Sequence, residues 1–232
     1  MKLSKRLKAI CDLIPDNSKI IDVGADHALT DIYLIKYKNC KCLATDISEK
    51  ALEGAERNAK KYNVNLSTLV TDGLNNVKIS NEIIIISGMG AHTIKRILSK
   101  NITNDIIIGS HTDVPSIRRF MYKKGYHIKK EIAIYEKHYY VITYYEYGKA
   151  NKIDFVVSPF LIGNIPYMEK ELEYYQIKYQ NEKKLFKKIK YHNIISKIEK
   201  RKGHISWHLF YTKNVGPTSY CSSTFSETLF VL

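Results

Sequence analysis

Short apolar runs alternate with amphipathic stretches along the first 147 residues of the chain. Runs rich in Ile and Val and bounded by turn residues predict strands at 19–24, 41–46, 66–71, 82–88, 104–109, 126–135 and 138–147. Apolar residues recurring every three or four positions predict helices at 2–14, 28–38, 48–62, 90–100 and 114–124. Uninterrupted Ile runs at 83–86 and 106–108 suit strands buried on both faces. The alternation therefore predicts an α/β fold, with a doubly wound parallel sheet and right-handed crossovers.

The last two predicted strands depart from this alternation. Only Glu136 and Lys137 separate them, so they need a tight hairpin and the final strand lies antiparallel to its predecessor. Five strand–helix units followed by an antiparallel terminal hairpin resemble the outline of a Rossmann-like class I methyltransferase sheet.

The pattern changes after residue 150. Residues 151–165 contain Pro159 and Gly163 and are typical of a linker, whereas residues 166–202 form a C-terminal helical appendage with a coiled-coil-like seam. The seam residues are Met168, Leu172, Tyr175, Tyr179, Phe186 and Ile189. The appendage is either one long helix or a helical hairpin broken near 181–184 or at 192–193. Residues 203–232 are nearly uncharged and rich in Ser, Thr and aromatics, and form an atypical tail, either poorly ordered or foreign to the domain.

The net charge of +14 indicates a negatively charged binding partner. Residues 151–202 carry twelve Lys/Arg against six Asp/Glu, and a positive field of this kind favours polyanions such as nucleic acids. The alternative is a solvated, lysine-rich surface. No apolar run is long enough for a membrane span and the start lacks a signal-like apolar segment, so we expect a cytoplasmic protein. Four cysteines without a C-x-x-C pair predict reduced structural thiols and no metal site.

Acids and glycines follow the predicted strands one after another. In open α/β sheets ligands bind at the carboxyl ends of the strands, so these residues are expected to share one cleft edge. They are Gly24, Asp26 and His27 with Asp22 before them, then Asp46 and Ile47, then Asp72 and Gly73, and finally Ser87, Gly88 and Met89.

The loop after the first strand distinguishes between two kinds of ligand. A dinucleotide site needs several glycines whose backbone approaches a pyrophosphate, but only Gly24 is present and Asp26 would repel a pyrophosphate. S-adenosyl-L-methionine carries a sulfonium and an ammonium group, and both are favoured by a carboxylate. We therefore expect Gly24 to border the methionine end, Asp46 to accept the ribose hydroxyls, Asp72 to accept the adenine amino group, and the backbone of 87–90 to border the methyl group. Helix caps and a common turn are the alternatives for these acids.

Four stretches carry a resemblance to one family. "LSKRLKAI" at 3–10, "DVGADHA" at 22–28, "TDG" at 71–73 and "SGMG" at 87–90 are similar to the bacterial tRNA (adenine(22)-N(1))-methyltransferases, the TrmK family. The resemblance covers about residues 1–165. It implies a Rossmann-like catalytic domain, here residues 1–150, with bound S-adenosyl-L-methionine, and a helical element that helps to hold tRNA. The chain departs from the family at Leu29-Thr30-Asp31, where Tyr-Leu-Pro is usual, and at Gly109-Ser110-His111, where Gln-Pro-Asn is usual.

These expectations combine into one hypothesis. An adenosine is flipped out of its stack, and its N1, which already has a lone pair, attacks the methyl group without a strong base. Asp26 is the expected catalytic residue, stabilising the cationic adenine, with Arg6 and His27 supporting it. His111 is expected to contact substrate, and Arg118, Arg119, Lys123 and the basic run 183–190 to contact phosphates. A methyltransferase acting on another RNA or on a protein, and a non-catalytic RNA-binding protein, are the alternatives.

Overall fold

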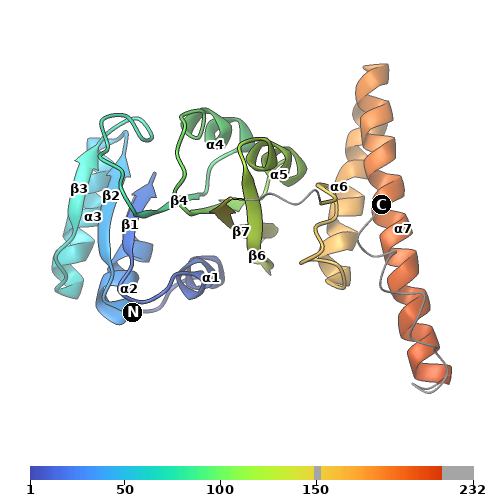
Figure 1. Cartoon of the computed structure of the whole chain (residues 1–232), viewed down its shortest axis with the longest axis horizontal. Helices are drawn as coiled ribbons and strands as arrows, with labels where there is room; N and C mark the ends of the chain where they lie inside the picture. Colours follow the sequence, from blue (N-terminus) through green and yellow to red (C-terminus); the bar gives the residue numbers. More distant parts are fainter. Residues whose placement is uncertain (149–152, 216–232) are drawn as a thin grey trace. The chain divides into compact units, whose positions relative to one another are not determined.

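The computed structural model describes residues 1–148 and 153–215, which form two compact units. The first unit is Met1–Lys152 and the second begins at Ile153. Figure 1 colours the helices and strands of both units by their place in the sequence, from blue at the N-terminus to red at the C-terminus.

The first unit is built around a seven-stranded sheet with the order β3-β2-β1-β4-β5-β7-β6. The strands are β1 (Lys19–Val23), β2 (Lys41–Asp46), β3 (Ser67–Val70), β4 (Ile83–Ser87), β5 (Ile106–Ser110), β6 (Tyr126–Tyr135) and β7 (Tyr139–Tyr147). The helices are α1 (Lys5–Leu13), α2 (Leu29–Lys38), α3 (Glu49–Tyr62), α4 (Ala91–Ile97) and α5 (Val114–Lys123). Every predicted element is present, and the boundaries differ mainly by one or two residues.

The strand pairing confirms the predicted Rossmann-like fold with its terminal hairpin. Strands β1 to β5 pair in parallel, and β7 enters antiparallel between β5 and β6. The hairpin places β7 inside the sheet and β6 at its edge, because β7 continues the hydrogen-bonded ladder of β5. The side chains of the β6–β7 turn therefore come close to the carboxyl end of β5.

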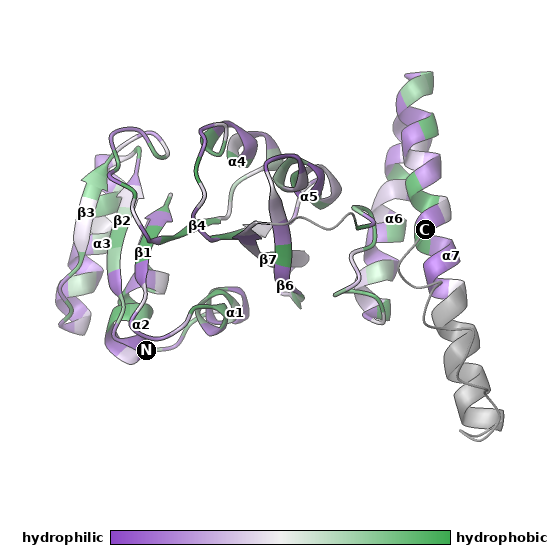
Figure 2. Cartoon of the chain, in the orientation of Figure 1, coloured by the Kyte–Doolittle hydropathy of each residue, from purple (hydrophilic) through white to green (hydrophobic). Residues whose placement is uncertain are grey.

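The two faces of the sheet form two hydrophobic cores. Alternate residues of one strand point to opposite faces, so Ile84 and Ile86 pack beneath α4 and α5, while Ile83 and Ile85 pack against α1 and α2. A smaller cluster around Ala44 and Leu52 holds α3. Figure 2 shows the resulting hydrophobic colour along the central strands.

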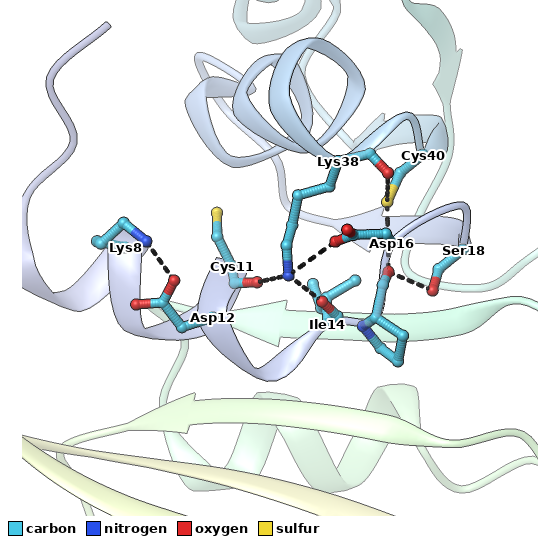
Figure 3. A network of polar contacts seen from close by, with 9 residues as sticks. Lys8, Cys11, Asp12, Ile14, Asp16, Ser18, Lys38 and Cys40 are labelled. Carbon is cyan, nitrogen blue, oxygen red and sulfur yellow. Dashed lines mark hydrogen bonds and ion pairs between the residues drawn. The ribbon is translucent and has the colours of Figure 1, made fainter.

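Helix α1 is fixed by a polar network at its C-terminal end (Figure 3). The ammonium of Lys38, at the end of α2, donates to the carbonyl of Cys11 at 3.1 Å and to that of Ile14, and pairs with Asp16 at 3.5 Å. Free carbonyls at a helix C-terminus carry partial negative charge, which a lysine offsets. Because this end is held, the opposite end of α1, with Arg6, has a defined position.

The second unit contains α6 (Ile165–Asn181) and α7 (Leu185–Val215), which pack against each other. Asn164 caps α6 by accepting the N–H of Tyr167 at 3.1 Å, and Pro166 occupies the first turn. Of the two predicted architectures, the helical hairpin is present, with its break at 182–184. Lys202 joins the helices through an ion pair with Glu169 at 3.0 Å.

The predicted seam is only half correct. Met168 and Tyr175 are buried, but Phe186 and Ile189 are exposed, and α7 instead buries Ile194 and Ile198. The non-helical residues 182–184 change the helical phase between α6 and α7. A three- and four-residue spacing continued from α6 into α7 therefore predicts the wrong buried face of α7. Helix α7 also continues past 202, where the helical pattern was predicted to end, to Val215. Residues 216–232 of the predicted tail lie outside the described residues.

The cysteines within the described ranges are isolated thiols. Cys11, Cys40 and Cys42 are buried and unbridged, and burial raises the pKa of each thiol, to about 12 for Cys11. This agrees with the predicted structural thiols, whereas Cys221 lies outside the described residues. None of the helices in the described part of the chain is long and apolar enough to cross a bilayer.

Candidate functional site

The loop after β1 has an unusual backbone. Gly24, Asp26 and Ala28 all have positive φ values, of 74°, 48° and 49°. For a non-glycine residue this conformation costs about 1 kcal/mol or more and is retained mainly where the surroundings impose it. Here the N–H groups of Gly24 and Ala25 both donate to the carbonyl of Thr45, at 2.8 and 3.0 Å. The loop is therefore held against the end of β2.

This backbone presents Asp26 and His27 to solvent. Both side chains are 65% exposed, and the Asp26 carboxylate lies 3.6 Å from His27 Nε2. The main chain is fixed on both sides: the N–H of Asp26 donates to Asp46 Oδ2 at 3.3 Å, and Asn58 donates to the carbonyl of His27 at 3.0 Å. The Asp26 side chain makes no helix-capping hydrogen bond, so the capping alternative for it does not apply.

Gly24 lies directly under the loop after β4. A Cβ built at Gly24 would lie 2.2 Å from Met89 Cε. The ends of β1 and β4 thus meet, as the sequence predicted, and Gly24 is needed for its positive φ as well as for this close approach. The methionine side chain is flexible and covers the glycine.

The ends of β2 and β3 supply two further acids. Asp46 accepts from the N–H of Ser48 at 2.9 Å through Oδ1. Beside it, Ile47 is 70% exposed, which is unusual for a large aliphatic side chain. Asp72 forms a bidentate ion pair with Arg96, at 2.9 and 3.0 Å. The hydrogen bonds from Arg96 lower the pKa of Asp72. Sequence reasoning missed Arg96, because no local pattern links α4 to the loop after β3.

Asp22 differs from the other acids because it is buried. Burial raises the pKa of Asp22 to about 6. Burial and then the neighbouring Asp22 raise the pKa of Asp31, in the first turn of α2. The two carboxyls therefore hold one proton between them around neutral pH. Asp31 belongs to the Leu29-Thr30-Asp31 departure noted in the sequence, which is the signal that could have singled it out.

Arg6 connects α1 with the ends of β4 and β7. Its Nη1 donates to Ser87 Oγ at 2.8 Å, and its guanidinium lies 5.0 Å from the centre of the Tyr140 ring. The main-chain N–H of Arg6 donates to Glu136 at 2.9 Å. His111, after β5, lies against the rings of His138 and Tyr140. The sequence identified Arg6, Ser87 and His111 but missed the hairpin residues, because the turn was interpreted only as a connection.

One predicted substrate residue is wrong. Arg118 is wholly buried and forms a bidentate ion pair with Glu131, at 3.0 and 2.9 Å, so it cannot contact phosphate. Its neighbour Arg119 and Lys123 are exposed on α5, where contact with a ligand is sterically open.

The arrangement suits an S-adenosyl-L-methionine molecule better than a diphosphate. Four acids lie in or just after the last residues of β1, β2 and β3: Asp22, Asp26, Asp46 and Asp72. The loop after β1 contains a single glycine, Gly24. The exposed Ile47 offers an apolar surface for a base, and Asp46 keeps lone pairs for hydroxyl donors. No cluster of His, Cys, Asp and Glu able to hold a metal occurs within 1–148 and 153–215.

Comparison with known proteins points in the same direction. Residues 3–143 match the family described as "Methyltransferase domain". The chain is 30% identical over 145 residues to the tRNA (adenine(22)-N(1))-methyltransferase of Bacillus subtilis, a match that covers 59% of this chain and 61% of that relative.

Solved structures extend the similarity to most of the chain. The structure of M. capricolum TrmK in complex with S-adenosyl-homocysteine is 29% identical, with a TM-score of 0.72, and the match covers 89% of this chain and 99% of that one. B. subtilis TrmK is 25% identical, with a TM-score of 0.72 and coverage of 87% and 98%. The resemblance seen in the sequence motifs is thereby confirmed, and the chain belongs to the methyltransferase domain family.

Proposed function

We propose that this chain is an S-adenosyl-L-methionine-dependent methyltransferase that modifies N1 of an adenine in tRNA, at the position that corresponds to adenosine 22. The observation that carries the proposal is the acidic loop after β1, held in a positive-φ backbone against Thr45 and Met89. It is supported by the similarity to TrmK of M. capricolum over nearly the whole length of that protein. Action on tRNA would place the protein in the cytoplasm.

The residues at the strand ends divide the work of binding the donor. Gly24 lets the main chain approach the methionine end, and Asp46 accepts the ribose hydroxyls. Ile47 packs against the adenine ring, and Asp72, oriented by Arg96, accepts from the adenine amino group. The buried Asp22 lies behind the loop and adds negative potential for the ammonium group. When bound, the donor supplies an electrophilic methyl group on a sulfonium.

For the adenine that accepts the methyl group, correct orientation matters more than a general base. Adenine N1 has an in-plane lone pair, so the protein must orient the ring and stabilise the positive charge that develops on it. The exposed carboxylate of Asp26 is the group available for this role, because its main chain is fixed by Asp46 while its side chain remains in solvent. Arg119, Lys123 and the basic residues of α6 and α7 bind phosphates.

The test is methylation of an unmodified tRNA transcript with labelled donor, followed by nucleoside analysis. The expected product is 1-methyladenosine, and mapping its position identifies the target. Asp26→Ala should lower turnover by about 100-fold or more, as for loss of one charge-stabilising group, without lowering the melting temperature. Glu53→Ala is the matched control, since the Glu53 side chain is similarly exposed at 61% and forms only a surface pair with Arg57 on α3. Normal turnover of Asp26→Ala would remove Asp26 from the mechanism, and a methylated base other than adenine would overturn the proposed reaction.

A further inference from the structure

Three aromatic rings from two separate segments meet beside the candidate site. His111 follows β5, whereas His138 and Tyr140 lie at the β6–β7 turn. The ring centres of His111 and His138 are 4.6 Å apart, those of His111 and Tyr140 5.2 Å, and those of His138 and Tyr140 4.8 Å. His111 and His138 are exposed and Tyr140 is half-buried. We call these three residues the aromatic cluster.

Contacts with Arg6 of α1 hold the aromatic cluster in place. Arg6 lies over Tyr140 and donates to Ser87, while Glu136 at the turn accepts the main-chain N–H of Arg6. That hydrogen bond lowers the pKa of Glu136. The turn is therefore tied to α1, whose far end is fixed by Lys38.

The cluster borders the loop that is expected to lie at the transferred methyl group. A Cβ at Gly88 would lie 3.9 Å from Arg6 Nη1, and the N–H of Gly88 donates to the carbonyl of Gly109 at 3.2 Å. A Cβ at Gly109 would lie 2.5 Å from Ser87 Oγ. The ends of β4 and β5 are therefore in direct contact, and the rings after β5 stand next to the residues after β4.

The chemistry of the cluster fits a planar base. Burial, then His138 and Arg6, lower the pKa of His111, so its imidazole is neutral at pH 7. Uncharged aromatic faces stack on bases of RNA, and they also attract a ring that becomes cationic. The ionisable groups around the rings include Arg6 from α1, Glu136 and Lys137 from the turn, and the two histidines. The cations can attract the RNA backbone, whereas the three rings offer stacking faces that only a base can use.

We propose that His111, His138 and Tyr140 form the wall against which the flipped-out target purine of the RNA stacks during methyl transfer. The inference rests on the proposed function, and it names the site that receives the acceptor base. Each ring acts as a positioning group through stacking and removes no proton.

The experiment measures single-turnover methylation of the tRNA transcript by His138→Ala, His111→Ala and the double variant. Loss of a base-stacking ring is worth about 1–3 kcal/mol, so the expected fall in rate is about 5- to 150-fold for each single variant. His138→Phe should keep most of the rate, because stacking is retained without a titratable nitrogen. The affinity for the donor, measured by calorimetry without RNA, should be unchanged in all variants.

Tyr135→Ala is the matched control. Tyr135 is an exposed ring of the same hairpin, but it pairs with Tyr139 on the opposite face. Its removal should leave the rate unchanged. A second readout is the fluorescence of 2-aminopurine placed at the mapped target position, which stacking on the cluster should quench in the wild type and not in His138→Ala.

The outcomes separate the two proposals. If the wild type methylates tRNA and the double variant does so at a normal rate with normal quenching, the aromatic cluster is not the base site and the proposed function stands. If His138→Phe is as slow as His138→Ala, stacking is the wrong explanation. If the wild type binds the donor but methylates no adenine, the proposed function fails, and this inference fails with it.

Discussion

Two buried pairs of ionisable side chains in the first unit have opposite characters. Arg118 on α5 and Glu131 on β6 are both fully buried and complementary, with two hydrogen bonds between them and a third from Thr143 at 2.7 Å. Asp22 and Asp31 are also buried, but both are acids. Asp31 has no cation as a partner among the described residues, and its neighbour is the Asp22 carboxyl.

The difference between the pairs follows their places in the fold. Arg118 and Glu131 join a helix to the edge strand, where a buried charge must be compensated if the hairpin is to stay attached. Asp22 and Asp31 lie beneath the strained loop that presents Asp26. Residues that violate the usual rules of burial without compensation concentrate at functional sites. The like-charged pair therefore lies next to the proposed donor site, and we expect it to lower the stability of the fold.

The largest effect is expected from breaking the complementary pair. Arg118→Met leaves the Glu131 carboxylate buried without a cation, and such losses amount to about 3–5 kcal/mol of unfolding free energy. Urea denaturation measures it. The double variant Arg118→Met, Glu131→Leu should recover much of the loss, because no charge is then left buried. A single variant as stable as the wild type would show that the pair contributes nothing to the fold.

The like-charged pair should respond in the opposite direction. Asp31→Asn removes one of two competing carboxyls, so we expect it to raise the free energy of unfolding at pH 8 by about 1–3 kcal/mol, because burial and the neighbouring Asp22 disfavour the Asp31 carboxylate. The exposed Asp16→Asn is the control and should have little effect. Destabilisation by Asp31→Asn would mean that the carboxyl has a partner that compensates its burial.

The pH dependence of folding stability tests the Asp22–Asp31 pair independently of how large the effect of Asp31→Asn is. The folded pKa of Asp22 is raised to about 6, above its usual 3.8, so between these values the folded state holds a proton that the unfolded state has lost. Stability contributed by this group is therefore full at low pH and is lost as the pH rises through about 6. The advantage of Asp31→Asn should be largest at pH 7–8 and vanish near pH 4. An advantage that stays constant from pH 4 to 8 would contradict the shared proton.

Particular residues show how far the sequence could predict this structure. Strands such as Ile83–Ser87 were predictable because burial on both faces leaves an unbroken apolar run. The strand-end acids were predictable because the fold brings those ends together. Arg118 and Arg119 look alike in the sequence, and only the helical phase of α5 buries one and exposes the other. A glutamate in the middle of a strand, Glu131, was the sequence feature that could have indicated a buried partner for Arg118. Thr143 lies opposite Glu131 and donates a hydrogen bond to it.

Contacts between distant segments were beyond the sequence. His138 and Tyr140 share a face by strand alternation, but their approach to His111 depends on β7 inserting between β5 and β6. The exposure of Phe186 and Ile189 likewise depends on where the helix breaks. Local patterns specify elements, whereas these sites depend on how the elements are joined.

The smallest effect on stability is expected for a second arginine–carboxylate pair, which lies at the surface. Asp72 and Arg96 also form a bidentate pair, but their side chains are 39% and 55% exposed. Water screens such a pair and solvates either partner when the other is removed. Arg96→Met should therefore leave the urea midpoint almost unchanged, although it deletes the same two hydrogen bonds as Arg118→Met. Because both variants remove one guanidinium from one carboxylate, the difference between them reports mainly the burial of Arg118 and Glu131, together with their further contacts. If Arg96→Met were as damaging as Arg118→Met, the geometry of the ion pair, and not its removal from water, would determine its contribution to stability.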